Sequence, residues 1–300
     1  MKFFKEHFGI PKKQEVDFLD IPLDNDIEFF IDPYLIANNR SMKINDDIYV
    51  QLKSFFGKLN QDFIVPNNKV LGLDFLDNLH EPNEYHLGYS GTNKGAAISE
   101  TRAQTIFDSL RNNRFAKVGI SITNEAHNIL LLVTGIGQDI MSDTIANVCR
   151  NIYAEFTFQQ CQKFKIPTQP YKRHFYNINT NAWETESFEL PEYRGKPIIL
   201  LPRNIISSTR SYVNHYNYFI AGNYISKEVL AGKMLVAADG TYIRTFKDGT
   251  KKAIIKKIAE SCYKAKDDLI DYVLEYGGSL ESFLDYAKEH YPAINLSEFE

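Results

Sequence analysis

Cysteine is scarce in this 300-residue chain, which contains only Cys149, Cys161 and Cys262. A small, odd number of cysteines does not build a disulfide framework, and reduced thiols are typical of the cytosol. No Cys-x-x-Cys pair or cysteine–histidine cluster has the spacing of zinc ligands. The sequence therefore argues against a disulfide-rich secreted protein and against a structural zinc site.

Long apolar runs and an excess of one charge are also missing. Nowhere do about 18 uncharged apolar residues follow one another, as a transmembrane helix requires. The formal net charge is only −4, which is not the balance of a nucleic-acid or anionic-membrane binder, although a local basic patch stays open. Residues 1–10 begin like a signal peptide, but Glu6 and His7 interrupt the apolar stretch. We expect a cytoplasmic protein with no membrane segment.

Apolar residues are plentiful enough for a folded core, at 44% of the chain. Residues 45–63 carry an amphipathic helix whose core stripe is Ile48, Leu52, Phe55, Phe56, Leu59 and Phe63. The same spacing predicts helices over residues 143–164, 251–276 and 279–291, and a helix or irregular connection over residues 68–79. The short apolar run 129–133 is either a buried strand or the last turns of a buried helix, and helix is the favoured interpretation. Ser142 would cap the helix 143–164, and Asp32 before Pro33 is a good cap for another helix.

Strands are expected in three places. Residues 16–23 and 27–31 predict a hairpin around Leu-Asp-Asn-Asp, and two Asp-Gly turns predict another between residues 235 and 250. Residues 175–201 predict a meander or a pair of hairpins that ends in the apolar strand 197–201.

These elements indicate an α+β fold, with mixed helices, a small antiparallel sheet or meander, and a mainly helical C-terminal part. The best boundary lies near residues 204–210, so we expect an α+β body over residues 1–205 and a helical region over residues 206–300.

The stretch Thr-Gly-Ile-Gly-Gln-Asp-Ile-Met-Ser-Asp, residues 134–143, joins an apolar segment to a helix. If the helix begins near Ser142, Asp139 lies just before it, and Asp143 and Asn147 share a face. Their oxygen atoms could converge on Mg²⁺, which is often held by one or two carboxylates, waters and a substrate phosphate. The alternative is a turn that enters a well-capped helix. Asp139 and Asp143 are therefore candidate metal ligands and catalytic residues.

The polar loop 88–95 contains three glycines, with Ser90 and Lys94 between them. The backbone of such a loop can wrap a phosphate, to which Lys94 would add charge. The loop matches neither the P-loop nor the G-x-G-x-x-G pattern, because Ala96 and Ala97 follow its last glycine. A surface loop without a ligand and a phosphate-binding loop both stay open.

The C-terminal part offers two further surfaces. Residues 210–226 contain five aromatic side chains that could stack bases or fill a core groove, and packing is the favoured interpretation. The start of the predicted helix 251–276 is the one obvious basic patch. Its lysines, among them Lys252 and Lys256, could contact phosphates or form a solvated face.

Acids and a lysine lie along the predicted β segment. Glu186, Glu189 and Lys196 invite comparison with metal-dependent nucleases of the PD-(D/E)xK type, which place acids and a lysine on adjacent strands. The strict Asp/Glu-x-Lys triplet is absent, and such residues are common on an exposed β surface. Glu189 is a candidate third carboxylate, and Lys196 a candidate for stabilising transition-state charge.

Four stretches resemble those of a group of uncharacterised bacterial proteins that tend to sit in anti-phage defence and restriction regions. They are Phe-Phe-Ile-Asp-Pro-Tyr-Leu-Ile, His-Leu-Gly-Tyr-Ser, Gly-Ile-Gly-Gln-Asp-Ile-Met-Ser-Asp-Thr-Ile-Ala-Asn and Lys-Pro-Ile-Ile-Leu-Leu-Pro-Arg-Asn-Ile-Ile. The resemblance spans roughly residues 20–205. Arg203 stands where the relatives carry lysine, and the glycine loop is less glycine-rich. The resemblance implies a setting in immunity against mobile elements, with no activity to transfer.

Two hypotheses follow. The first is a magnesium-dependent nuclease in which Asp139 and Asp143, with Glu189, hold the metal and Lys196 stabilises the transition state of phosphodiester hydrolysis. The second is a non-catalytic sensor or adaptor of a multi-protein defence complex, with the C-terminal part as its contact surface. Nucleic acid and other defence proteins are the expected partners, and the sequence leaves oligomerisation open.

Overall fold

The computed structural model describes residues 2–88, 99–117, 121–233 and 242–294. Its α-helices are α1 (Phe4–His7), α2 (Pro33–Asn38), α3 (Lys43–Lys58), α4 (Lys69–Leu76), α5 (Ser99–Asn112), α6 (Arg114–Lys117), α7 (Ala126–Leu132), α8 (Gln138–Val148), α9 (Arg150–Phe164), α10 (Tyr212–Ile220), α11 (Ser226–Leu230), α12 (Ile255–Ser261), α13 (Leu269–Glu275) and α14 (Ser279–His290). Its strands are β1 (Phe30–Ile31), β2 (Gln169–Asn177), β3 (Ala182–Leu190), β4 (Glu192–Tyr193), β5 (Lys196–Pro197), β6 (Ile206–Ser207), β7 (Ile243–Thr245) and β8 (Lys251–Ala253).

The fold is α+β, as the sequence predicts, with helices around small antiparallel sheets of two strands each. The largest sheet is the long hairpin β2–β3, in which Gln169 lies opposite Leu190 and Asn177 opposite Ala182. Within the described residues, no helix is long and apolar enough to cross a membrane.

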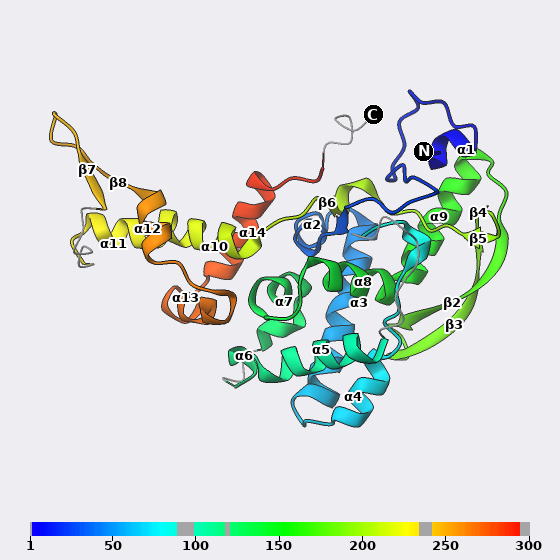
Figure 1. Cartoon of the computed structure of the whole chain (residues 1–300), viewed down its shortest axis with the longest axis horizontal. Coiled ribbons are helices and arrows are strands. Elements are labelled where there is room, and N and C mark those ends of the chain that lie inside the picture. The colour runs from blue at the N-terminus through cyan, green and yellow to red at the C-terminus, as the bar shows by residue number, and fades with distance from the viewer. Residues whose placement is uncertain (1, 89–98, 118–120, 234–241, 295–300) are drawn as a thin grey trace.

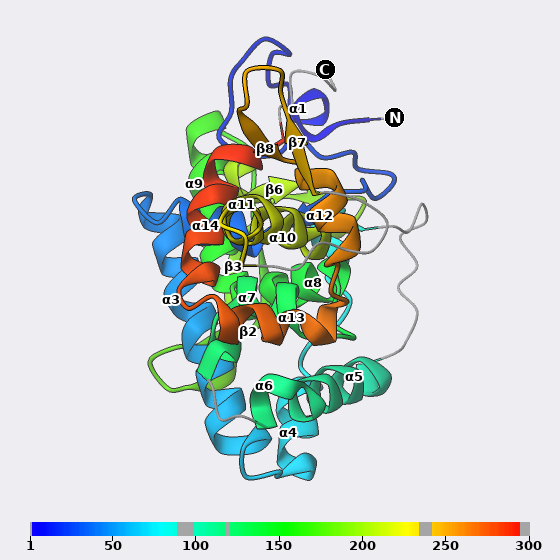
Figure 2. The same ribbon diagram turned by 90° about the vertical axis from the view of Figure 1, so that its left-hand side faces the viewer.

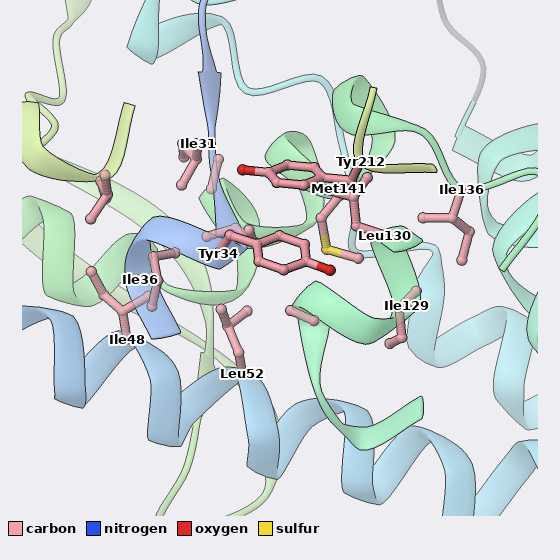
Figure 3. Close-up of a cluster of buried hydrophobic side chains, with 14 of the residues drawn as sticks. Ile31, Tyr34, Ile36, Ile48, Leu52, Ile129, Leu130, Ile136, Met141 and Tyr212 are labelled. Atoms are coloured by element: carbon pink, nitrogen blue, oxygen red, sulfur yellow. The ribbon is translucent and has the colours of Figure 1, made fainter. Parts of the chain in front are cut away.

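The core forms where α2, α3, α7 and α8 meet. Figure 3 shows Ile48 and Leu52 of α3, Ile129 and Leu130 of α7, and Met141 of α8 gathered around Tyr34. Each of these side chains is buried, as are Phe55, Phe56 and Leu59 of the predicted stripe, whereas Phe63 lies beyond α3 and is partly buried. The favoured helix over residues 129–133 is confirmed as the end of α7, with Val133 as its C-cap residue. Tyr34 also stacks on Tyr212 of α10 at 4.0 Å between ring centroids, so the C-terminal part shares this core.

Two predicted strands near the N-terminus do not pair with each other. Phe30 and Ile31 pair with Ser207 and Ile206, far along the chain, and residues 16–27 make only isolated bridges, such as Phe18 to Pro202. The predicted hairpin over residues 16–31 is therefore wrong. The cap at Asp32 is confirmed, because its Oδ1 accepts from the backbone N–H of Tyr34 at 2.9 Å with Pro33 at the first helical position.

The long helix predicted over residues 251–276 is also wrong. Lys251–Ala253 forms β8, and two short helices, α12 and α13, follow. The break between them has a tertiary cause, since Asn217 of α10 bonds both the N–H and the C=O of Lys264. The hairpin β7–β8 confirms the second of the two predicted Asp-Gly turns, whereas the first lies outside the described residues.

Elsewhere in the described chain the β and helix predictions are largely confirmed. Residues 169–190 form a hairpin, α4 covers residues 69–76, and α14 covers residues 279–290. The apolar stretch 197–201 differs, because only Pro197 belongs to a strand and residues 198–201 run buried without one. Figures 1 and 2 show α10–α14 and β7–β8 on one side of the helices α2–α9.

Candidate functional site

Helix α8 places the two candidate aspartates one turn apart on a single face. It begins at Gln138, with Gly137 as its N-cap residue. Asp139 therefore lies in the first turn, and Asp143 and Asn147 follow at intervals of four residues. The predicted start at Ser142 is wrong, because the Ser142 hydroxyl instead accepts from the backbone N–H of Ile31 at 3.0 Å. The helix predicted as one piece over residues 143–164 is divided at Cys149 into α8 and α9.

Arg102 of α5 connects the aspartates to a third carboxylate. Its Nη1 lies 2.5 Å from Asp143 Oδ2, and its Nη2 lies 3.0 Å from Glu81 Oε2. Asp139 acts electrostatically on both Arg102 and Asp143. We call Glu81, Arg102, Asp139 and Asp143 the carboxylate–arginine cluster.

The cluster lies beside the start of the glycine loop. A Cβ on Gly88 would come within 3.9 Å of Asp139 Oδ1, so the backbone at Gly88 passes next to this carboxylate. The candidate phosphate-binding residues Ser90 and Lys94 lie outside the described residues.

Burial sets the proton affinity of the two aspartates. Desolvation raises the pKa of Asp143 to about 8, Arg102 opposes this rise, and Asp139 and Glu81 add to it. The pKa of Asp139 is also raised, mainly by burial. Burial acts to lower the pKa of Arg102, but Asp143, Glu81 and Asp139 outweigh it, so the guanidinium stays protonated. A carboxyl group that titrates near neutral pH can act as a general acid or base.

Asn147 does not join the aspartates as an oxygen ligand. Its amide donates to the backbone carbonyls of His80 and Asp143 at 2.7 and 2.8 Å, and its Oδ1 accepts from Arg150 Nη2 at 2.7 Å. The expected convergence of three oxygen-bearing side chains is therefore not formed. Arg150 is held in turn by Glu84 at 2.8 Å, and this ion pair is largely buried. The polar face of α8 thus continues into a structural network at the start of α9.

Among the described residues, no group of three or more His, Cys, Asp or Glu side chains is arranged to hold a metal ion. Asp139 and Asp143 remain candidates for two carboxylate ligands. Two carboxylates can hold Mg²⁺ when water and substrate phosphate complete its octahedron. A metal ion at Asp143 would compete with Arg102 for the same carboxylate.

The other candidate residues lie on other elements. Glu189 is exposed on β3, where its Oε2 accepts from the Thr168 hydroxyl at 3.2 Å. Lys196 is exposed on β5, opposite Tyr193. No described contact joins either residue to the cluster. Lys252 lies on β8 and Lys256 on α12, both exposed, in the C-terminal region.

Sequence reasoning missed Glu81 and Arg102, which complete the cluster. Arg102 lies 41 residues before its partner Asp143, and Glu81 lies a further 21 residues back. Spacing along the chain carries no signal for pairs this far apart. The one feature of the sequence that pointed to Arg102 is its position in the first turn of a helix that follows the glycine loop.

The fold and this site define an α+β protein with a carboxylate–arginine cluster in which Asp143 is buried, Arg102 and Asp139 are partly buried, and Glu81 is exposed. Residues 9–214 match the family described as Domain of unknown function (DUF8370), and because the match covers more than half of the chain, the chain belongs to this family. The match includes all four residues of the cluster and ends within α10. No curated protein and no solved structure matches the chain.

Proposed function

We propose that this chain is a cytoplasmic component of bacterial anti-phage defence that hydrolyses nucleic-acid phosphodiesters at the carboxylate–arginine cluster. The observation that carries the proposal is Asp143, a carboxyl group with a pKa of about 8 in contact with a guanidinium. Perturbed carboxyl groups of this kind concentrate at catalytic sites. The resemblance to proteins of defence regions supplies the biological setting.

Each residue of the cluster has a role in this proposal. Asp139 and Asp143 would hold Mg²⁺ with their two carboxylates, for which Asp143 must give up its proton, and the metal would supply an activated water as the nucleophile. Arg102 would bind the phosphate and stabilise the charge of the transition state. Glu81 would keep Arg102 in place. Arg102 thus takes the part that the sequence had suggested for Lys196, whereas no residue of the cluster takes the part of Glu189 as a third metal ligand.

Cleavage of plasmid DNA and structured RNA tests the proposal, in Mg²⁺, in Mn²⁺ and in EDTA. Asp143→Asn, Asp139→Asn and Arg102→Met should each lower metal-dependent cutting by at least about a hundredfold, as expected for a lost transition-state contact. Asp47→Asn is the matched control, because Asp47 forms only an exposed ion pair with Lys43. Circular dichroism establishes that each variant folds. Absence of cutting under every metal, or cutting that ignores all three changes, would overturn the proposal.

A non-catalytic sensor or adaptor is the second candidate. Arg102 favours it, because its guanidinium already contacts both Asp143 and Glu81 without any metal. In that case the cluster is structural and joins α5 to α8. Arg102→Met would then lower stability, and wild-type protein would cut no substrate. Binding to other proteins of the defence system would be its measurable activity.

A further inference from the structure

The hairpin β7–β8 is built by local chemistry to project from the C-terminal region. Gly249 has φ +82° and donates its N–H to the carbonyl of Phe246 at 3.0 Å, and Phe246 donates its N–H to Thr250 at 2.8 Å. A turn that ends in such a left-handed glycine is a common three-residue hairpin loop. Asp248 fixes the turn further by accepting from the backbone N–H of Thr250 at 2.9 Å.

Only the base of the hairpin is packed. Ile243 and Ala253, which lie opposite each other, pack against the core, whereas all residues from Arg244 to Lys252 are exposed. Figure 1 shows the hairpin beyond α11 and α12, at the end of the C-terminal region farthest from α2–α9. The exposed segment therefore stabilises little of the fold.

Its charge is strongly one-sided. Residues 243–257 contain six cations and one acid, Asp248; the cations are Arg244, Lys247, Lys251, Lys252, Lys256 and Lys257. Lys256 faces Glu260 at 4.0 Å, and within the described residues the structure gives none of the other five an ion pair. The one acid, Asp248, accepts a hydrogen bond from the backbone N–H of Thr250 and, among the residues that the structure describes, pairs with none of these cations. The hairpin is thus a cationic arm on a chain whose net charge is −4.

Two of these cations lie directly opposite each other and beside an exposed ring. Arg244 pairs with Lys252 across the strands, although like charges in this position are destabilising. The centroid of the Phe246 ring lies 5.5 Å from the Arg244 guanidinium carbon and 5.7 Å from Lys252 Nζ, and Phe246 is 39% exposed. An exposed ring beside two cations offers a base a stacking surface and its phosphates two charges.

We propose that the β7–β8 hairpin binds single-stranded nucleic acid, with a base stacked on Phe246 and phosphates on Arg244 and Lys252. An acidic peptide would contact the cations but would not need the Phe246 ring. A duplex keeps its bases stacked inside the helix, so its bases could not stack on this ring either. The inference deepens the proposed function by naming a substrate form. It rests on that function only in assuming a nucleic-acid ligand, and its test requires no cleavage.

Fluorescence anisotropy in EDTA tests the binding, with the full chain and a labelled single strand of about 20 nucleotides. Arg244→Ser/Lys252→Ser should weaken binding at least tenfold and lower the slope of log K against log salt by about 1.4. Phe246→Leu, which keeps an apolar side chain but removes the ring, should weaken binding about fivefold or more. The matched control is Lys43→Ser/Lys58→Ser, which removes two lysines that are paired with Asp47 and Asp62 on or just after α3.

Single-strand binding that responds equally to the hairpin and control variants would overturn the inference, as would binding to duplex alone or to anionic vesicles alone. Absence of cleavage with intact, hairpin-dependent binding would overturn the proposed nuclease and leave the hairpin inference standing. If both hairpin variants still cleave and bind single strands as tightly as wild type, the hairpin inference is overturned and the proposed nuclease stands.

Discussion

At the scale of single residues, two buried aspartates differ in what surrounds them. Asp32 is fully buried, but its carboxylate accepts from the Tyr34 N–H, from the Tyr212 hydroxyl at 2.7 Å and from Arg210 at 3.3 Å. Within the part of the chain that the structure describes, the side-chain oxygens of Asp143 accept from one donor, Arg102, and two further acids act on them electrostatically. Burial with few hydrogen-bond donors favours the protonated form of a carboxyl group, and burial is the main cause of the raised pKa of Asp143.

Asp143→Asn should change how stability depends on pH. The pKa of Asp143 rises from 3.8 to about 8 on folding, so between these values the folded state holds a proton that the unfolded state has released. Wild-type stability should therefore fall as pH rises from about 4 to about 8, and Asp143→Asn, which cannot titrate, should lose this part of the decline. Urea unfolding at pH 5, 6.5 and 8 measures it. A constant difference between wild type and variant at all three pH values would show that Asp143 does not titrate in this window.

At the scale of elements, the two glycines of the turn before α8 differ in backbone conformation and in the space around them. Gly135 has φ +90°, and a Cβ there would lie 2.3 Å from the Ser109 hydroxyl oxygen, whereas Gly137 has φ −91° and open space. Gly135→Ala should therefore destabilise the protein by about 1–3 kcal/mol, from backbone strain and the displaced serine. Gly137→Ala should cost less, about 1 kcal/mol at most, because it meets no contact and loses only the preference for glycine over alanine at an N-cap position. Equal unfolding midpoints for the two variants would contradict this assignment.

The junction between α8 and α9 depends on one glutamine of α3. Gln51 Nε2 donates to the carbonyl of Val148 at 2.7 Å, where α8 ends, and to the carbonyl of Tyr176 at 2.8 Å on β2. Gln51→Leu keeps the approximate shape but leaves two carbonyls without this donor, so it should cost about 1–3 kcal/mol. Gln162→Leu, at an exposed position of α9, is the control. Unfolding free energies that match between the two variants would show that the junction does not need this amide.

At the scale of the whole molecule, the features that the sequence predicted correctly depend on contacts between residues close in sequence. The features that it missed depend on contacts between distant residues. The α3 stripe, the cap at Asp32, the strands of β2–β3 and the turn at Asp248–Gly249 follow from neighbours within a few residues. The errors arise where distant segments decide. Phe30 pairs with Ser207, Gln51 accounts for the end of α8, and Asn217 interrupts the helix expected over residues 251–276. The same holds for the candidate site. Local spacing was enough to predict Asp139 and Asp143 on one face of a helix, but not the contribution of Glu81 and Arg102.

Two arginines tie the C-terminal part to the body, and they should contribute unequally. Arg210 bonds buried Asp32 and the carbonyls of Tyr291 and Pro292, just after α14, whereas Arg114 of α6 forms exposed ion pairs with Asp268 and Asp271, each at 3.0 Å.

Arg210→Met should lower the free energy of unfolding by about 3–5 kcal/mol, because it leaves the Asp32 carboxylate buried without its cation. Arg114→Met removes the same charge and a similar length of side chain, yet should cost less than about 1 kcal/mol, because water and salt screen an exposed pair. Hydrogen exchange locates the effect: Arg210→Met should speed exchange in α2 and α14, and Arg114→Met should leave both unchanged. If the two variants unfold alike, the buried pair is not what joins the two parts, and the aromatic packing of Tyr34 on Tyr212 is left to hold them together.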